Sequence, residues 1–170
     1  MKRIWTLFFV IAGISFYSAQ SMAGFYIEPK MDYNALSLDA SGINVDGLKG
    51  TTIGARLGYD LAVFVLALDY SAGSLDAEIG GATKSADSSR LGATFIFAPP
   101  VIPFNLLAGY YTAKLDTDTT DYSGDGTKFG VMFTMLPIVN INLEYFNTAY
   151  DKDSLRDKGL TIGLSADFSL

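Results

Sequence analysis

Apolar and polar residues alternate along most of the chain from Phe25 onward. Because successive side chains of a β-strand point to opposite faces, this spacing predicts extended strands with one apolar and one polar face. The pattern is clearest at the end of the chain, where every second position is apolar: Leu160, Ile162, Leu164, Ala166, Phe168 and Leu170. Eight strands are expected on this basis, at about 25–36, 51–60, 64–71, 88–97, 104–114, 128–136, 139–149 and 158–170.

The segments between these strands alternate in length. Four are long, polar and rich in Gly, Asp, Ser and Thr (39–50, 73–86, 115–126 and 150–157), whereas those near 61–63, 98–103 and 137–138 are tight. Short turns on one side and longer loops on the other are typical of outer-membrane barrels. The strand lengths also suit a tilted bilayer crossing of ~9 to 11 residues. We therefore predict an all-β fold, an eight-stranded antiparallel up-and-down transmembrane β-barrel.

Periodicity alone leaves open whether the apolar face meets lipid or the core of a soluble barrel. The aromatic residues of the apolar face gather at the two ends of the strands, as expected for belts at the two interfaces of a bilayer. We expect one belt at the short-turn end, made of Phe25, Tyr59, Phe64, Phe97, Phe104 and Phe168, and one at the long-loop end, made of Tyr33, Tyr70, Tyr110, Phe129 and Tyr145.

The N-terminus has the order of a secretory signal peptide. Lys2 and Arg3 precede an apolar run over 4–14, and the small-residue site 21–23 follows it. A retained membrane anchor is the alternative, but the run falls short of the ~20 residues that span a bilayer. We expect residues 1–23 to be cleaved and 24–170 to form the barrel, with both termini periplasmic and the long loops extracellular.

Charge and composition exclude several classes of function. Residues 24–170 carry ten basic and eighteen acidic side chains, a net charge of −8, so no nucleic-acid partner is expected. The chain has neither cysteine nor histidine. It therefore lacks thiolate and imidazole metal ligands, and it lacks the usual base for nucleophilic catalysis. We expect no enzyme activity and no cofactor.

The polar face of the strands carries a balanced set of charges that would meet inside the barrel. It comprises four acids and four bases: Glu28, Lys30, Asp32, Arg56, Asp69, Arg90, Lys128 and Glu144. Charges removed from water need partners, so the favoured interpretation is a structural network that plugs the lumen. An ion pathway or gate is the alternative, and glycines on the same face leave a narrow passage open as a hypothesis.

The segment 115–126 superficially resembles a calcium-binding loop. Its opening acids have the spacing of an EF-hand, but Asp121 stands where that loop needs Gly, and Thr127 stands where it needs Glu. A solvated acidic loop is the favoured interpretation. Divalent ions bridging such loops to lipopolysaccharide phosphates are a second hypothesis.

By strand count, loop asymmetry and the terminal strand, residues 24–170 resemble the small eight-stranded outer-membrane barrels typified by OmpX and the membrane domain of OmpA. The resemblance implies contact with outer-membrane lipid and lipopolysaccharide, and recognition of the last strand by the barrel-assembly machinery. The family pattern ends in an aromatic residue, whereas this chain ends in Leu170 with Phe168 before it in phase.

The expected function is a non-enzymatic structural or surface-interaction role through the four extracellular loops, with an unidentified ligand. The alternatives are a narrow ion or solute channel and, third, a lipid-modifying enzyme.

Overall fold

A single sheet that closes on itself makes up the computed structural model. It describes residues 24–40, 43–61, 63–79, 82–100, 102–117, 120–134, 139–152 and 155–169. The predicted signal peptide (1–23) and Leu170 lie outside this part of the chain, so the expectations attached to them stay predictions. Within the described residues, no helix is long and apolar enough to cross a membrane.

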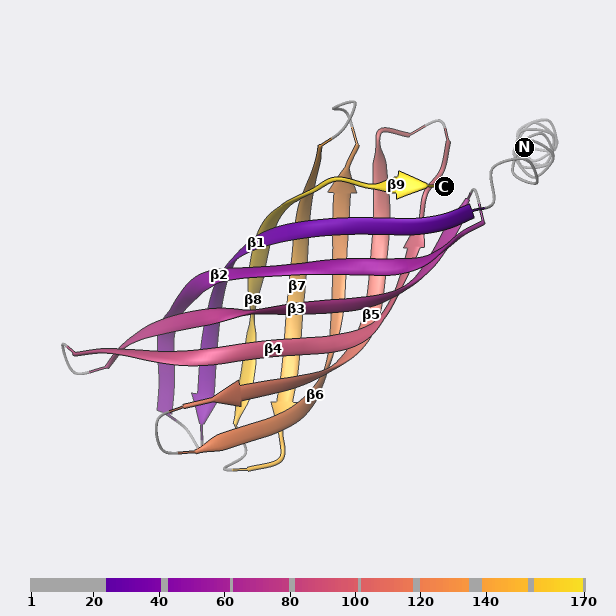
Figure 1. Ribbon diagram of the computed structural model, residues 1–170. Helices are drawn as coiled ribbons and strands as arrows, with labels where there is room; N and C mark the ends of the chain where they lie inside the picture. The colour runs from indigo at the N-terminus through magenta and orange to yellow at the C-terminus, as the bar shows by residue number, and fades with distance from the viewer. Residues whose placement is uncertain are drawn as a thin grey trace, which may run out of the picture.

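The strands follow one another around a barrel. They are β1 (Gly24–Ala40), β2 (Ile43–Asp60), β3 (Phe64–Ile79), β4 (Ala82–Phe97), β5 (Phe104–Asp116), β6 (Asp121–Phe133), β7 (Asn140–Tyr150), β8 (Arg156–Ser165) and β9 (Phe168–Ser169). Strands β1 to β7 each pair antiparallel with the next, and β1 also pairs with β8 and β9, which closes the barrel (Figure 1). Because β9 continues β8 along the same edge of β1, the two count as one of eight strands around the barrel wall, here called staves. The predicted fold class is confirmed.

The start of β1 and the end of β9 lie side by side at one end of the barrel, here called the terminal end (Figure 1). The opposite end, where β1 meets β2 and β3 meets β4, is the far end. Along the staves near the terminal end, apolar side chains point outward. Ile53, Leu68, Leu91 and Ile162, for example, are each more than half exposed. An apolar surface of this extent is what a membrane barrel presents to hydrocarbon.

Towards the far end, the polarity of the two faces reverses. On β3, Tyr70 is the last large apolar side chain that points outward. Beyond it, Leu75 and Ala77 point into the barrel and are buried, whereas Ser74 and Asp76 are exposed. The same exchange occurs on β1, β2, β5 and β7. We call this polar-surfaced part of the wall the far extension, residues 34–40, 43–50, 71–79, 82–90, 111–117, 120–127, 146–152 and 155–159.

The far extension corrects the predicted loops, because the strands run further than expected. Most of 39–50, 73–86 and 115–126 is paired strand, and the connection at 150–157 is shortened at both ends by β7 and β8. These segments are polar because their outward face meets water, not because they are irregular. With lengths of 16 to 18 residues, β1 to β4 exceed the ~9 to 11 that a bilayer needs.

The last predicted strand is interrupted, which divides it into β8 and β9. Pro29 of β1 stands opposite this gap, and its carbonyl oxygen accepts a hydrogen bond from the backbone N–H of Ala166 at 3.2 Å. Proline has no N–H to donate in return. The ladder between β1 and the final segment therefore lapses at Ala166 and Asp167 and resumes at Phe168, which pairs with Ile27.

The outward orientation of the apolar face leads to a stability prediction. Leu143 lies outward on β7 and is 39 % exposed. We expect Leu143→Arg to lower the free energy of unfolding by roughly 2 to 4 kcal/mol, because it moves a charge into hydrocarbon. Asn147 lies on the same face of β7 beyond Tyr145, the last outward tyrosine of this strand, so Asn147→Arg should cost at most ~1 kcal/mol. Urea unfolding in lipid vesicles measures both, and equal midpoints would contradict the assignment of the lipid-facing surface.

Candidate functional site

The lumen is filled in three layers, with a charged layer between two largely apolar ones. The structure places all eight predicted lumen charges inside the barrel, each at most 6 % exposed. They come from six different strands, because every inward position of the staves contributes to the same narrow interior. The layers determine whether anything can pass along the barrel axis.

Arg56 of β2 lies at the centre of the charged layer and is fully buried. Its Nη1 donates to both carboxylate oxygens of Glu28 at 2.9 Å, and its Nε donates to Asp69 Oδ2 at 2.9 Å. Its Nη2 donates to Glu144 of β7. One guanidinium therefore joins three carboxylates from three strands, using the fork of donors that makes arginine suited to buried ion pairs.

Two lysines complete the charged layer. Lys30 Nζ lies 3.1 Å from Asp32 Oδ2, 3.4 Å from Asp69 Oδ1 and 3.8 Å from Glu144 Oε1. Lys128 Nζ pairs with Asp69 and lies 3.3 Å from Glu144 Oε2. Neutral groups add to the network, since Tyr26 donates to Glu28 at 2.6 Å. Seven of the eight predicted charges thus form one connected cluster.

Arg90, the eighth, stands apart and has a partner that the sequence analysis missed. Its Nη2 lies 3.8 Å from Asp157 Oδ2, and its guanidinium carbon lies 4.4 Å from the ring centre of Phe146. Asp157 also accepts a hydrogen bond from Tyr150 at 2.8 Å. Burial and this carboxylate raise the pKa of Tyr150, which keeps the hydroxyl protonated as a donor. Asp157 was assigned to a loop, although it continues the inward phase of Thr161 and Gly159.

Apolar side chains fill much of the lumen on either side of the charges, and β7 and β8 add the buried polar residues Asn140, Asn142 and Ser165 at the terminal end. At the terminal end the buried set is Tyr26, Val65, Ala67, Ile96, Leu107 and Met132. Towards the far end, a larger set fills the inside of the far extension: Leu36, Leu48, Leu75, Ala77, Ala86, Tyr111, Ala113, Leu115, Phe146, Tyr150 and Leu155. Water and ions would have to cross both layers to traverse the barrel.

A small cavity lies inside the barrel. A cavity between the charged layer and the far apolar layer, lined by Lys30, Asp69, Arg90, Tyr111 and Phe146 among others, has a volume of about 10 Å³. That is about the space of a single water molecule. The carboxylates and ammonium groups around it are buried and ion-paired, so the arrangement supports a plug.

The described acids do not assemble into a metal site. No group of three or more acidic side chains suited to a metal ion occurs among the residues that the structure describes. In the segment singled out as calcium-like, Asp116 and Asp121 face each other as strand partners, and Asp125 is an exposed residue of β6. Its residues 115–116 and 121–126 are paired strand and not a loop, and residues 118 and 119 lie outside the described part of the chain.

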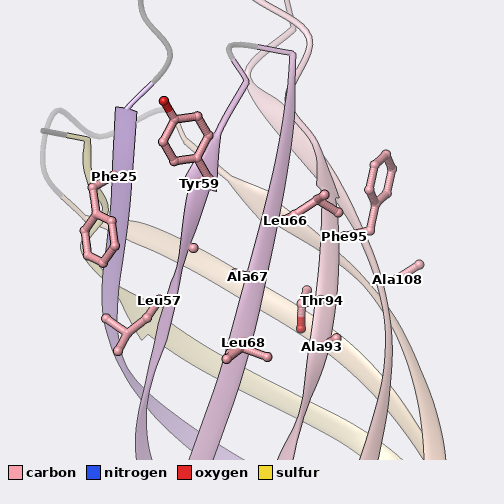
Figure 2. Close-up of a pocket in the computed structure, with 11 residues that line it drawn as sticks. Phe25, Leu57, Tyr59, Leu66, Ala67, Leu68, Ala93, Thr94, Phe95 and Ala108 are labelled. Carbon is pink, nitrogen blue, oxygen red and sulfur yellow. The ribbon is translucent and has the colours of Figure 1, made fainter.

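The aromatic residues predicted for the two belts lie on the outward face. At the terminal end, strand register pairs Phe25 with Tyr59 and Phe64 with Phe97. Two further rings in the same phase, Phe95 and Phe133, also point outward. Figure 2 shows large side chains around a depression of about 780 Å³ in this part of the outer wall. Its lining is apolar and continuous with the lipid-facing surface.

Comparison with known proteins identifies the architecture. No family model matches the chain, and no curated protein matches it. The crystal structure of Ail, the attachment invasion locus protein of Yersinia pestis, is similar with a TM-score of 0.59 at 13 % identity, covering 85 % of this chain and 99 % of Ail. The crystal structure of Neisserial surface protein A is similar with a TM-score of 0.57 at 19 % identity, covering 86 % and 99 %.

A third similar structure was determined in a lipid bilayer. It is that of the Yersinia pestis outer membrane protein Ail in a phospholipid bilayer nanodisc, with a TM-score of 0.52 at 11 % identity, covering 83 % of this chain and 99 % of Ail. At these identities the likeness shows the fold. The chain therefore has the architecture of the small eight-stranded outer-membrane β-barrels, as its resemblance to them implied.

The charged layer yields a prediction about stability. Arg56→Met leaves three buried carboxylates without their shared partner, so we expect it to lower the free energy of unfolding by roughly 3 to 5 kcal/mol. The double variant Arg56→Met/Glu28→Gln should regain part of this loss, because it neutralises one of those carboxylates. Arg156→Met removes an exposed arginine and should stay within ~0.5 kcal/mol of wild type. Denaturant titration of the barrel in detergent measures the free energy of unfolding of these three variants. A loss for Arg56→Met no larger than that for Arg156→Met would rule out a stabilising network.

Proposed function

We propose that this protein is a non-enzymatic barrel of the bacterial outer membrane, whose lumen is a structural plug and whose far extension interacts with partners outside the cell. The filled lumen is the observation that carries this proposal. A barrel that conducted ions would need a continuous water-filled path, whereas the inward side chains on both sides of the charged layer are buried and packed together. The function is therefore assigned to the outer surface of the barrel, above all to the far extension, which projects beyond the lipid.

The wall itself supports an outward orientation of the far extension. At the far end the hairpins continue well beyond the length that a bilayer requires, whereas at the terminal end the strands stop at outward aromatic residues such as Phe64, Phe97 and Phe133. In outer-membrane barrels the longer projecting segments are extracellular. The names of two proteins with this fold, an attachment invasion locus protein and a surface protein, agree with a role at the cell surface.

The charges of the lumen do not favour catalysis. Each ammonium and guanidinium group of the central cluster is held between carboxylates, and the cluster lies behind apolar side chains at both ends. A substrate in water or in lipid would have to displace one of these layers to reach it. We therefore assign the cluster to stability and strand register.

The plug can be tested by recording from planar lipid bilayers. We expect the purified barrel to insert without producing discrete conductance steps, because no continuous aqueous path runs along its axis. A large porin recorded under the same conditions controls for detection, and protease protection of the recovered membranes confirms insertion. Reproducible unitary steps from the inserted protein would overturn the plug and favour the channel alternative.

The orientation can be tested by labelling, which the absence of native cysteine makes specific. Thr83→Cys places a thiol at an exposed position of the far extension, and Ile102→Cys places one in a turn at the terminal end. We expect a membrane-impermeant maleimide to label Thr83→Cys on intact cells and Ile102→Cys only after the outer membrane is permeabilised. The reverse pattern would show that the barrel is inserted the other way round.

A further inference from the structure

A groove on the outer wall, where β2, β1 and β8 lie side by side, combines an apolar floor with two exposed lysines. Its volume is about 340 Å³. The lining residues are Ala35, Leu36, Ser37, Gly47, Lys49, Lys158, Gly159 and Leu160. It lies just beyond Tyr33, at the boundary between the lipid-facing surface and the far extension.

An irregularity in the strands shapes this groove. Leu36 pairs with Leu48 and Ser37 with Asp46, so Gly47 is an extra residue in β2. Gly47 has a φ of 100°, a left-handed conformation that glycine adopts without strain. An extra glycine with positive φ is typical of a β-bulge, which bends the strand. The bulge leaves the wall without a large side chain at this point.

The two lysines flank β1 from opposite sides. Lys49 of β2 pairs in register with Ala35 of β1, and Lys158 of β8 pairs with Ser37 of β1. Because neighbouring strands are ~4.8 Å apart, β2 and β8 stand roughly 10 Å apart across β1. Within the described part of the chain, neither ammonium group has an ion-pair partner within 4 Å.

The charge around these lysines differs from that on the rest of the far extension. Away from the groove, β4 to β6 present four exposed acids, Asp87, Asp116, Asp121 and Asp125, and two exposed lysines, Lys84 and Lys114. Around the groove, Arg156 adds a third exposed cation on β8. Three acids lie close by in register: Asp39 is the partner of Arg156, Asp76 is the partner of Lys49, and Asp46 is the partner of Ser37. The register partners of Lys158 are the neutral Ser37 and Asn147.

The depth of the lysines matches the headgroup layer of a bilayer. They stand two to four residues beyond the level of Tyr33 along tilted strands, which places them roughly 5 to 10 Å further from the membrane centre. A headgroup layer is roughly 5 to 8 Å thick on each side of the hydrocarbon. Ala35 and Leu160 lie level with Lys49 and one outward position nearer the membrane than Lys158, and they continue the apolar face that meets lipid.

We propose that this groove binds a phosphate-bearing lipid of the outer leaflet, with the phosphate between Lys49 and Lys158 and an acyl chain along Ala35 and Leu160. Exposed lysines at headgroup depth attract lipid phosphates. The bulge at Gly47 supplies the space that the headgroup occupies, and the Ser37 hydroxyl lines the same space. This inference rests on the membrane orientation in the proposed function.

The test is titration of the full barrel in neutral detergent with diphosphoryl lipid A, with native mass spectrometry to count bound lipid. Wild-type protein should retain one lipid A molecule, and Lys49→Gln/Lys158→Gln should weaken its apparent affinity by about tenfold to thirtyfold. The matched control Lys84→Gln/Lys114→Gln removes the same charge from exposed positions of β4 and β5, and should bind as wild type. Dephosphorylated lipid A should bind all three proteins weakly, and inorganic phosphate should not compete.

Equal losses in the two double variants, or equally tight binding of dephosphorylated lipid A, would overturn the site. Competition by millimolar inorganic phosphate would show an anion site that does not recognise a lipid, and would also overturn it. None of these outcomes affects the plug or the orientation, which conductance and cysteine labelling test separately. All four side chains changed are exposed, so the variants should fold, and the electrophoretic shift between heated and unheated barrel verifies this for each.

Discussion

The hydrogen bonds that join β1 to both β2 and β8 are the constraint on which the rest of this structure depends. In hydrocarbon, a backbone N–H or C=O without a partner is prohibitively unfavourable, so a sheet can lie there only when it has no free edge. Closure with eight staves fixes a narrow interior. Every inward side chain then has to share that interior with seven other strands, and any charge there must find its partner among them. The clustering of Arg56 with Glu28, Asp69 and Glu144 follows from this geometry.

The charged layer also bears on strand register. Since side chains alternate between faces, a slip of one residue along β2 would move Arg56 into lipid and Leu57 into the lumen. The same exchange would apply to Glu144 and Leu143 on β7. Buried ion pairs add little net stability compared with well-packed apolar groups, but breaking them is unfavourable. In this barrel a shifted register would be much less stable than the native one, because the shift would break these ion pairs. The apolar side chains on either side of the charged layer supply close packing.

The sequence predicted the membrane-embedded part of the wall because one pattern, apolar outward and polar inward, holds from Phe25 to Tyr33 and in the matching parts of the other strands. It did not predict the far extension, where Leu75 and Ala77 take the inward positions and Ser74 and Asp76 the outward ones. The period of two continues there, but in the opposite phase. Judged by composition alone, these segments therefore resembled loops. A search for alternation in either phase would have recovered these segments, and with them Asp157.

The contacts inside the lumen were beyond the reach of sequence reasoning for a different reason. The inward phase shows that Arg56 and Glu144 point to the same interior, but they are 88 residues apart in the chain. Which charges meet depends on the stagger between staves and on side-chain conformation. The groove at Gly47 is similar, because its bulge is a property of pairing between β1 and β2. No local pattern of residues in the sequence indicates this bulge.

For the surface role proposed above, the reversal of polarity along each strand has a consequence. Because the same strands run from the membrane into water around an apolar filling, the hairpins are extensions of a stiff cylinder and not tethered chains. A partner that docks on them meets a preformed shape, so little conformational entropy is lost when the complex forms. Variation in such a protein can then be confined to outward-facing positions of the hairpins, where a new side chain changes what is recognised without disturbing the packing beneath it.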